Sequence, residues 1–482
     1  MTSWAGRLRA GLTGGLALAA GGASCAEVEF RPDLAEHITA LQRIYPAEGP
    51  SSVIGNLRSA EQLAQTARLS ALGSDLTVIH LSGAIETGDA EKLKAVIEKS
   101  PSYNKVIVFE SPGGSFLEGF KIAEVLRYDL EGQDPGIKGV YVIGGAQCLS
   151  ACAIAFALSV DLVHADQADT RFIEHGAQVG FHMGFLPSEK ATQQAEVGQV
   201  LNLSYDISAA YSRLLNGGAN PPSLFREALK HRTQDSFFYL QGNVEAWQMG
   251  FSPVSRGLLA HPAYAYGLDE AGAARLCNTL IVHGRAYKSG AELEFGTVDP
   301  PEEPKPLEAP EGQTTWFSSG TNGGFACAIM AGPDKRLQAS VWRGSRQCAD
   351  GYRPADEFDV GWCPGKPVGT YPVTAGMIGD AYGCVDGKLH PDIMWNNFAD
   401  KTRKHPGRVS REVNFRESPD LKAGVIGKLQ PGQKVDITGC QLLPDFQAVW
   451  YEVDTGSGRG WLSARFVYPY LLQYRLDESS GQ

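Results

Sequence analysis

Short segments between residues 110 and 240 carry residue types that nucleophilic catalysis uses. Gly113 and Gly114 lie in the segment SPGGS, where glycines let backbone N–H groups approach a ligand as an oxyanion hole requires. Ser150 precedes an apolar helical segment, whose positive N-terminal potential favours a nucleophile and its oxyanion. His182 lies in the apolar run VGFHMG, and Asp235 precedes another apolar run. A serine nucleophile, a histidine base and an orienting carboxylate together indicate acyl transfer.

Each of these residues also has an ordinary structural interpretation. Serine is a favoured N-cap residue, so Ser150 can simply cap the helix that follows it. A histidine in an apolar run, such as His182, is more often a buried core residue than a base, and Asp235 suits a turn. The glycine segment fits a plain strand-to-helix turn. Phosphate binding is disfavoured there, because the Gly-Lys-Ser/Thr ending of a P-loop is absent.

Two cysteines flank Ser150 in the sequence. Cys148 and Cys152 are four residues apart, so their side chains can face each other on the first helical turn. They can form a strained local disulfide or act as two small buried apolar residues. We favour two buried thiols.

The elements that must position these residues alternate between strand and helix patterns. Short β-branched runs are separated by segments with helical spacing, which predicts an α/β sheet with crossover helices over residues 75–260. A helical or irregular extension is expected at 261–299. The predicted strands and helices lie, in chain order, at 76–81, 89–99, 105–109, 120–126, 140–143 and from about 149, with further helices at 190–216 and 221–232.

Taken in order, the SPGGS turn, Ser150, His182 and Asp235 resemble the motifs of the proteolytic subunit of the Clp protease and of the wider Clp/crotonase fold. The resemblance spans about residues 75–255, and its last part, NVEAWQMGF at 243–251, looks like that family's closing helix. It implies a core of repeated β-β-α units and a peptide or protein substrate. Homo-oligomers are compatible with it.

The resemblance also implies a role for each site residue. Ser150 would be the nucleophile, His182 the general base, and Asp235 the carboxylate that orients the imidazole. The oxyanion would be received by backbone N–H groups of the SPGGS turn and of the residue after the nucleophile. The residues implied for that oxyanion hole are Gly113, Gly114 and Ala151.

The sequence departs from the family pattern beside the nucleophile and the base. Ser150 is followed by Ala-Cys instead of Met-Gly, and His182 lacks the Gln-Pro that commonly follows. These departures resemble exported Clp-like proteins with a Cys-x-Ser-Ala-Cys signature, for which no partner ATPase is expected. Other interpretations are a Ser–Lys dyad using Lys190, an acyl-CoA enzyme of the crotonase class, which export disfavours, and a non-catalytic scaffold with a Clp fold.

The N-terminus predicts export. Residues 1–26 combine two arginines, an apolar core of about ten residues and a small-residue end, which is typical of a signal peptide and too short for a membrane span. Lipidation at Cys25 is a less favoured alternative. Residues 27–74 are expected to form a helical lead-in. The formal net charge of −11 disfavours nucleic-acid binding, which needs clustered Lys and Arg.

Prolines and cysteines mark the next boundary. Residues 300–313 form a Pro- and Glu-rich linker, and 314–400 form a small domain with four cysteines. In an oxidising compartment these cysteines are expected to form two disulfides among themselves, with no pairing implied. Their spacings do not fit zinc, and no metal or other cofactor is expected. The four cysteines are Cys327, Cys348, Cys363 and Cys384.

The C-terminal segment, 404–471, resembles bacterial SH3-like domains. The resemblance rests on VNFRESP at 413–419, the short strand patterns after it, and GWL at 460–462. Such domains often bind cell-wall peptides, which implies targeting. Three aromatic residues have two interpretations here, as a ligand surface or as core and edge residues of a barrel: Trp450, Tyr451 and Trp461.

Overall fold

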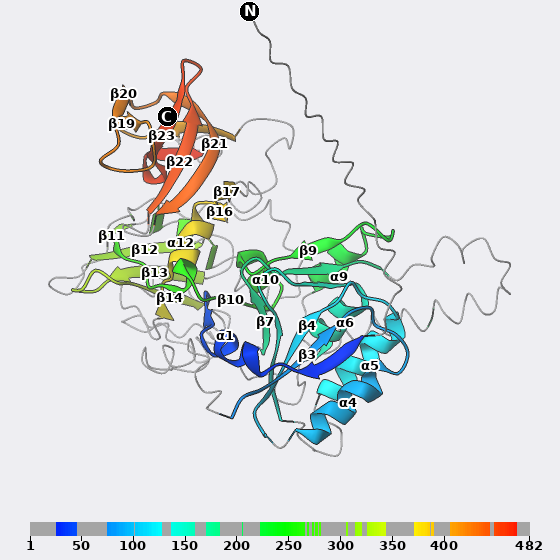
Figure 1. Cartoon of the computed structure of the whole chain (residues 1–482). Coiled ribbons are helices and arrows are strands. Elements are labelled where there is room, and N and C mark those ends of the chain that lie inside the picture. Colours follow the sequence, from blue (N-terminus) through cyan, green and yellow to red (C-terminus); the bar gives the residue numbers. More distant parts are fainter. Residues whose placement is uncertain are drawn as a thin grey trace, which may run out of the picture.

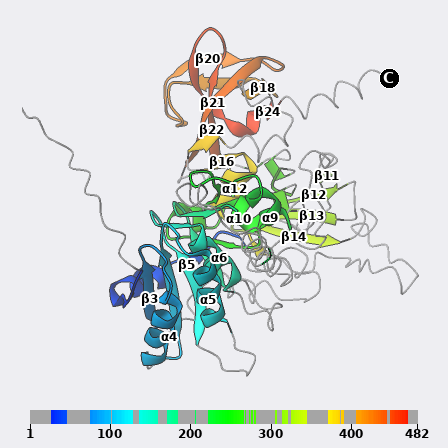
Figure 2. The ribbon, with the colours of Figure 1, turned by 90° about the vertical axis from the view of Figure 1, so that its right-hand side faces the viewer.

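The protein combines an α/β region, an antiparallel sheet and a C-terminal β domain. In the computed structural model, Figures 1 and 2 place the C-terminal β domain at the opposite end of the molecule from the α/β helices α4 and α5. In the part of the chain described, no helix is long and apolar enough to cross a membrane. The structure describes residues 26–45, 75–100, 102–127, 136–159, 170–183, 205, 222–265, most of 268–280, 305–306, 314–320, 325–343, 371–385, 387–389, 405–443 and 448–469.

Several predictions from the sequence fall outside these residues. They are the signal peptide up to Cys25, the whole of the lead-in after residue 45, Lys190 with most of the 190–216 helix, and two of the four clustered cysteines, Cys348 and Cys363.

The main sheet of the α/β region has a parallel centre. Its described strands follow the order β1-β3-β4-β5-β7-β10-β2, with parallel pairing from β3 through β10 and antiparallel pairing of β1 and β2 at the edges. The predicted alternation of strands and helices is confirmed. The strands are β1 (Glu27–Phe30), β2 (Gln42–Arg43), β3 (Thr77–Ser82), β4 (Lys105–Glu110), β5 (Ile137–Val142), β7 (Arg171–Glu174) and β10 (Ser252–Ser255).

The central strands are apolar because both faces of the sheet are covered. Ile107 and Phe109 of β4 pack into the cluster beneath the crossover helices, while Val106 and Val108 pack on the other face with Ile38 of α1. Strands buried on both sides read as continuous apolar runs, which is why β4 was predictable. The helices are α1 (Ala35–Thr39), α4 (Asp89–Lys99), α5 (Phe116–Leu126) and α6 (Ala151–Leu158), with a 3-10 turn η1 (Pro32–Leu34).

The lead-in differs from the prediction. Residues 27–74 were expected to be helical, but β1 pairs with β3 from Glu27 opposite Ser82 to Phe30 opposite Ile79. The sequence EVEF alternates polar and apolar residues, and Val28 packs against the main core, as a half-buried edge strand requires. Only the five-residue α1 and the turn η1 are helical between residues 27 and 45.

A second, small sheet leads to the predicted site residues. Its described strands follow the order β6-β8-β9, with β6 and β8 parallel and β8 and β9 antiparallel. Strand β6 follows β5, and β8 follows β7, after turns that contain Gly145 and Gly176 at positive φ. Each of the two pairs therefore passes from the main sheet into the small one. The strands are β6 (Gln147–Leu149), β8 (Gln178–Phe181) and β9 (Phe238–Leu240).

An antiparallel sheet and several short elements separate this region from the C-terminus. The described strands of the sheet are ordered β11-β12-β13-β14-β15. Lys305 and Pro306, inside the predicted linker, pair with Phe317 and Trp316 of β12 and so belong to this sheet. The elements are α9 (Pro222–Ala228), α10 (Val244–Gln248), η3 (Leu258–Ala260), β11 (Lys305–Pro306), β12 (Thr314–Gly320), β13 (Phe325–Ala331), β14 (Leu337–Arg343), β15 (Tyr371–Pro372), α12 (Ala375–Ala381), β16 (Cys384–Val385) and β17 (Lys388–Leu389).

The predicted disulfide pairing within the cysteine-rich segment is wrong for Cys384. Cys384 is bonded to Cys440, 56 residues away in the C-terminal β domain, with a Cα–Cα distance of 5.8 Å. Cysteine spacing does not determine pairing, and here the fold brings β16 against the β strand that carries Cys440. Cys277, outside the predicted cluster, is also disulfide-bonded.

The C-terminal β domain is built from seven strands in the described residues. Their order is β20-β19-β23-β22-β21-β18-β24, with antiparallel pairing throughout. The described part of the C-terminal region is therefore all-β, as the sequence predicted. The strands are β18 (His405–Val409), β19 (Val413–Arg416), β20 (Val425–Leu429), β21 (Lys434–Leu443), β22 (Ala448–Asp454), β23 (Arg459–Ser463) and β24 (Val467–Pro469), with a 3-10 turn η6 (Ala464–Phe466) before β24.

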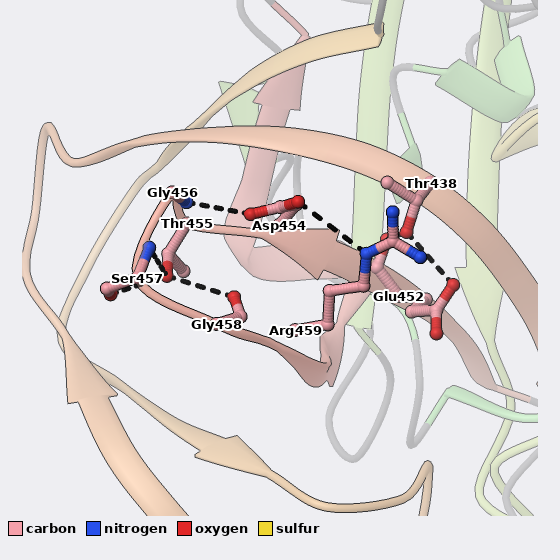
Figure 3. Close-up of polar contacts among 8 residues, drawn as sticks. All are labelled: Thr438, Glu452, Asp454, Thr455, Gly456, Ser457, Gly458 and Arg459. Atoms are coloured by element: carbon pink, nitrogen blue, oxygen red, sulfur yellow. Dashed lines mark hydrogen bonds and ion pairs between the residues drawn. The ribbon is translucent and has the colours of Figure 1, made fainter.

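The hairpin between β22 and β23 shows how local polar residues set this domain's turns (Figure 3). The Asp454 carboxylate accepts the N–H of Gly456 at 2.8 Å, and the Thr455 hydroxyl donates to the Gly458 carbonyl at 3.1 Å. Gly456 has φ +81°, a conformation that glycine adopts without the strain of a Cβ. Arg459 lies 3.6 Å from Asp454 across the hairpin.

Candidate active site

Ser150 occupies the sharp turn between β6 and α6. Its backbone has φ 54° and ψ −118°, one of two positive φ values among the described residues other than glycine. Its N–H donates to the Gly180 carbonyl at 2.9 Å, which fixes the turn against β8. Serine in this region of φ and ψ is strained, and such residues cluster at functional sites because the surrounding fold must hold them there.

The Ser150 hydroxyl separates the two interpretations that the sequence left open. Ser150 is the N-cap residue of α6, but its side chain makes no capping hydrogen bond. Its Oγ lies instead 2.6 Å from Nε2 of His182. The side chain is half-buried, so it remains reachable from solvent. Ser150 therefore occupies the position of a cap without capping, and its hydroxyl lies within hydrogen-bond distance of a histidine, as a serine nucleophile requires.

His182 follows β8 directly and is 5% exposed. Its Nδ1 lies 3.3 Å from the Thr233 carbonyl oxygen. A carbonyl only accepts, so this hydrogen bond places the proton on Nδ1 and leaves the Nε2 lone pair to accept from Ser150. The ring of Phe237 packs 4.4 Å from the imidazole, centroid to centroid. These contacts fix both the tautomer and the ring orientation that a general base needs.

Burial lowers the pKa of His182 below its ordinary value. The Thr233 hydrogen bond opposes this shift, and the charge of His231 nearby adds to it. The neutral imidazole, which is the form able to take a proton from Ser150, is therefore favoured at neutral pH.

Asp235 is not joined to His182. The residue is exposed, and no hydrogen bond or ion pair connects the two side chains in the part of the chain described. The Thr233 carbonyl, two residues earlier, takes the place at Nδ1 that the resemblance assigned to the carboxylate. Sequence reasoning missed this group, because a backbone carbonyl is present at every residue and leaves no signal in residue type.

The SPGGS turn is held directly against the Ser150 turn. The Ser111 carbonyl accepts the Leu149 N–H at 3.0 Å, and the Ser111 N–H donates to the Gln147 carbonyl at 2.8 Å. A Cβ added to Gly113 would lie 2.6 Å from the Leu149 carbonyl oxygen and 2.7 Å from the Cβ of Ser150. Only glycine permits this approach, because any side chain at residue 113 would collide with the Ser150 turn. The close contact of the two turns therefore explains the glycine at this position.

Gly114 and Ala151 offer unused N–H groups beside Ser150. In the described part of the chain, neither backbone N–H has an acceptor, whereas the Gly113 N–H donates to the Ser111 hydroxyl at 3.1 Å. Gly114 is fixed by Ile85, whose N–H donates to the Gly113 carbonyl and whose carbonyl accepts the Ser115 N–H. Among the three predicted oxyanion residues, Gly114 and Ala151 are therefore the free donors.

Cys148 and Cys152 form a disulfide, which corrects the prediction of two buried thiols. Their Cα atoms are 5.1 Å apart, and both residues are fully buried. The strand-to-helix turn brings them together, which is the alternative that the four-residue spacing left open. The bridge thus links the residues two before and two after Ser150.

Among the residues that the structure describes, no group of three or more His, Cys, Asp or Glu side chains is arranged to hold a metal ion.

The three aromatic residues with two interpretations in the C-terminal β domain lie largely in its interior. Trp450 is 4% exposed and Tyr451 is fully buried, while Trp461 is half-buried. The Tyr451 hydroxyl donates to the Tyr382 carbonyl at 2.7 Å, and burial raises the pKa of Tyr451 to about 12. Trp450 and Tyr451 therefore pack in the core and do not form a ligand surface.

Comparison with known proteins identifies the C-terminal part of the chain. Residues 411–468 match the family model of the bacterial SH3 domain, as the sequence of this region predicted. A search of curated proteins returned no match.

Proposed function

We propose that this protein is an exported serine hydrolase that cleaves peptide bonds, with Ser150 as the nucleophile and His182 as the general base. The observation that carries the proposal is the 2.6 Å contact between Ser150 Oγ and His182 Nε2. The serine that makes it has φ 54° and forms no capping hydrogen bond. A structural cap would have no need of a strained backbone or of a histidine partner.

The reaction follows from the geometry. Ser150 Oγ attacks the carbonyl carbon of the scissile bond while its proton passes to His182 Nε2. The developing oxyanion lies between the N–H groups of Gly114 and Ala151, at the positive end of α6. His182 then gives the proton to the amine nitrogen, the C–N bond breaks, and an acyl-enzyme remains. Water then attacks that ester while His182 takes its proton. The C–Oγ bond breaks, His182 returns the proton to Ser150 Oγ, and the acid is released.

The Thr233 carbonyl is the orienting group in this scheme. It holds the Nδ1 proton and presents its dipole to the imidazolium that forms during attack. A neutral carbonyl stabilises that cation less than an ionised carboxylate does, because charge-assisted hydrogen bonds are stronger. We therefore expect a slower enzyme than one with a complete Ser-His-Asp triad.

The strand arrangement supports the Clp/crotonase assignment. Strand β5 passes into β6 and then α6, and β7 passes into β8, as repeated β-β-α units would. The nucleophile follows the second strand of one unit and the base follows the second strand of the next. Homo-oligomers remain part of the proposal through this resemblance alone.

Export is supported by the disulfides. Cys148–Cys152 and Cys384–Cys440 are bonds that persist in oxidising compartments, in agreement with the predicted signal peptide at 1–26. The bacterial SH3 domain supports attachment to proteins or to cell-wall peptides, at a surface other than the buried Trp450 and Tyr451.

A second candidate is a binding scaffold that keeps the fold without catalysis. The exposed Asp235, unconnected to His182, favours it, because the resemblance implies a carboxylate there. The two functions differ in whether Ser150 reacts.

Fluorophosphonate labelling of the native protein, followed by mass mapping of the adduct, tests the proposal. We expect one adduct, on Ser150, that disappears on unfolding and in Ser150→Ala. Ser236→Ala is the matched control, because Ser236 also contacts a histidine, with its Oγ 2.7 Å from His231 Nδ1. Labelling that survives Ser150→Ala contradicts the proposal, and absence of labelling in the native protein supports the scaffold.

A further inference from the structure

The disulfide Cys148–Cys152 closes a loop with Ser150 at its centre. Cys148 lies in β6 and Cys152 in the first turn of α6, and their Cα atoms are 5.1 Å apart. Four residues of extended chain would span about 13 Å. The bridge therefore excludes an extended chain between the two cysteines and requires a turn there, which is the turn that carries Ser150.

The Ser150 turn has a more relaxed alternative. An N-cap serine ordinarily has φ and ψ in the β region, and its hydroxyl accepts the N–H of the second or third helical residue. Here the third helical residue is Ala153, and Ser150 makes no such bond. Relaxation to the ordinary cap would remove the strain at φ 54° and satisfy an N–H group of α6. It would also turn the hydroxyl away from His182.

Hydrogen bonds also hold Ser150, among them the 2.6 Å contact of its Oγ with His182 Nε2. Its N–H donates to the Gly180 carbonyl at 2.9 Å, and its carbonyl accepts the Ile154 N–H at 3.1 Å. The second bond is an ordinary first bond of the helix and persists in a capped serine. The His182 contact favours the observed conformation but is lost in the capped one, and the disulfide adds a covalent constraint on the chain between β6 and α6.

We propose that the Cys148–Cys152 disulfide is a positioning element that holds Ser150 in its reactive, non-capping conformation. This inference rests on the proposed function of Ser150 and adds a role for the two residues that flank it. A disulfide that closes so short a loop removes less chain entropy than one that closes a long loop. The 56-residue span of Cys384–Cys440 makes that bridge the more effective stabiliser of the fold, and thus the matched control.

The test compares Cys148→Ala/Cys152→Ala with Cys384→Ala/Cys440→Ala in the full chain. We expect the rate of fluorophosphonate labelling at Ser150 to fall about 100-fold in the first variant, as displacement of a catalytic group by about 1 Å does. The second variant is expected to keep the wild-type rate while losing more thermal stability. An unchanged rate in a folded Cys148→Ala/Cys152→Ala protein overturns the proposal.

Hydrogen exchange supplies a readout that loss of stability does not produce. In Cys148→Ala/Cys152→Ala, the relaxed Ser150 hydroxyl caps α6, so the amide of Ala153 is expected to exchange more slowly than in the wild type. General destabilisation would make it faster, which would contradict the proposal. Should the variant fail to fold, Cys148→Val/Cys152→Ala restores buried volume without the bridge and is measured in the same way.

The two proposals fail separately. If the wild type is not labelled, the hydrolase proposal is wrong. The hydrogen-exchange rate of the Ala153 amide then still decides whether the bridge keeps Ser150 out of its capping conformation. If the wild type is labelled and the bridge-free variant is labelled equally fast, only the positioning role falls.

Discussion

The hydroxyl groups of Ser150 and of Tyr451 in the C-terminal β domain differ in burial and in the kind of hydrogen-bond partner they have. Tyr451 is fully buried, and its hydroxyl donates to the Tyr382 carbonyl at 2.7 Å. Ser150 is half-buried at φ 54°, and its hydroxyl contacts His182 although a helix N-terminus lies beside it. Both residues looked functional in the sequence. One has its hydrogen bond satisfied within a packed core, whereas the other is held in a strained, reachable conformation.

The difference shows that residue type suggests chemistry but surroundings decide it. An aromatic residue in a β domain serves equally as a ligand surface or as core, and burial assigns Trp450 and Tyr451 to the core. A serine before a helix serves equally as a cap or as a nucleophile, and the absent capping bond distinguishes them at Ser150. Backbone strain retained without a capping hydrogen bond is typical of functional sites and supports the proposed role of Ser150.

The largest expected effect is at the base. His182→Ala should slow labelling of Ser150 about 1,000-fold, because proton abstraction in the transition state is lost. The matched variant Asp235→Asn should label close to the wild-type rate, because the exposed Asp235 makes no bond to the imidazole. Labelling kinetics on both variants check the prediction. A large loss of labelling rate in Asp235→Asn would show that Asp235 does orient His182, as the resemblance to the Clp protease implies.

The next effect concerns the glycine turn. A Cβ on Gly114 would lie 2.1 Å from the Ile85 carbonyl oxygen, and Gly114 has φ +147°. Gly114→Ala should therefore lower the free energy of unfolding by about 3 kcal/mol through overlap and strain. Gly145→Ala, at φ +87° with open space around it, should lose only about 1 kcal/mol. Urea unfolding measures both, and equal losses would contradict the close approach.

A smaller effect is expected in the C-terminal β domain. Tyr451→Phe removes the donor to the buried Tyr382 carbonyl and should lower the free energy of unfolding by about 1 kcal/mol. Tyr239→Phe is the control, since Tyr239 is 42% exposed and its hydroxyl makes no hydrogen bond in the described structure. Thermal unfolding that leaves Tyr451→Phe as stable as wild type would show that the contact with Tyr382 contributes nothing.

The smallest expected effect is a shift in the pH at which labelling of Ser150 is half-maximal. Only neutral His182 accepts the Ser150 proton, so labelling should fall as pH decreases through the pKa of His182. Because burial lowers that pKa, the midpoint is expected below about 6.5, the ordinary histidine value. Phe237→Ala uncovers the ring and should move the midpoint upward. A wild-type midpoint above the ordinary value would contradict the burial argument.

Elements with long uniform patterns were predictable from the sequence. The helix predicted at 89–99 is α4, and the strand predicted at 105–109 is β4 with one more residue. Both bury a continuous face or run, which residue type reveals directly. The four-residue β1 was missed, because so short an alternation competes with helical spacing in the residues around it.

The site was only partly predictable for a physical reason. Ser150, His182 and Gly114 carry side chains, or the lack of one, that mark chemistry in a sequence. The Thr233 carbonyl does not, and neither does the pairing of Cys384 with Cys440, because both depend on which segments the fold brings together. The four-residue spacing allowed the Cys148–Cys152 bond but did not decide between it and two thiols, because its formation depends on the local course of the chain.

An experimental structure of the fluorophosphonate adduct tests the central claim most directly. The account predicts phosphorus bonded to Ser150 Oγ, with the phosphoryl oxygen within hydrogen-bond distance of the Gly114 and Ala151 N–H groups, and the Cys148–Cys152 bridge intact. An adduct on another serine, or a phosphoryl oxygen directed away from both N–H groups, would contradict it.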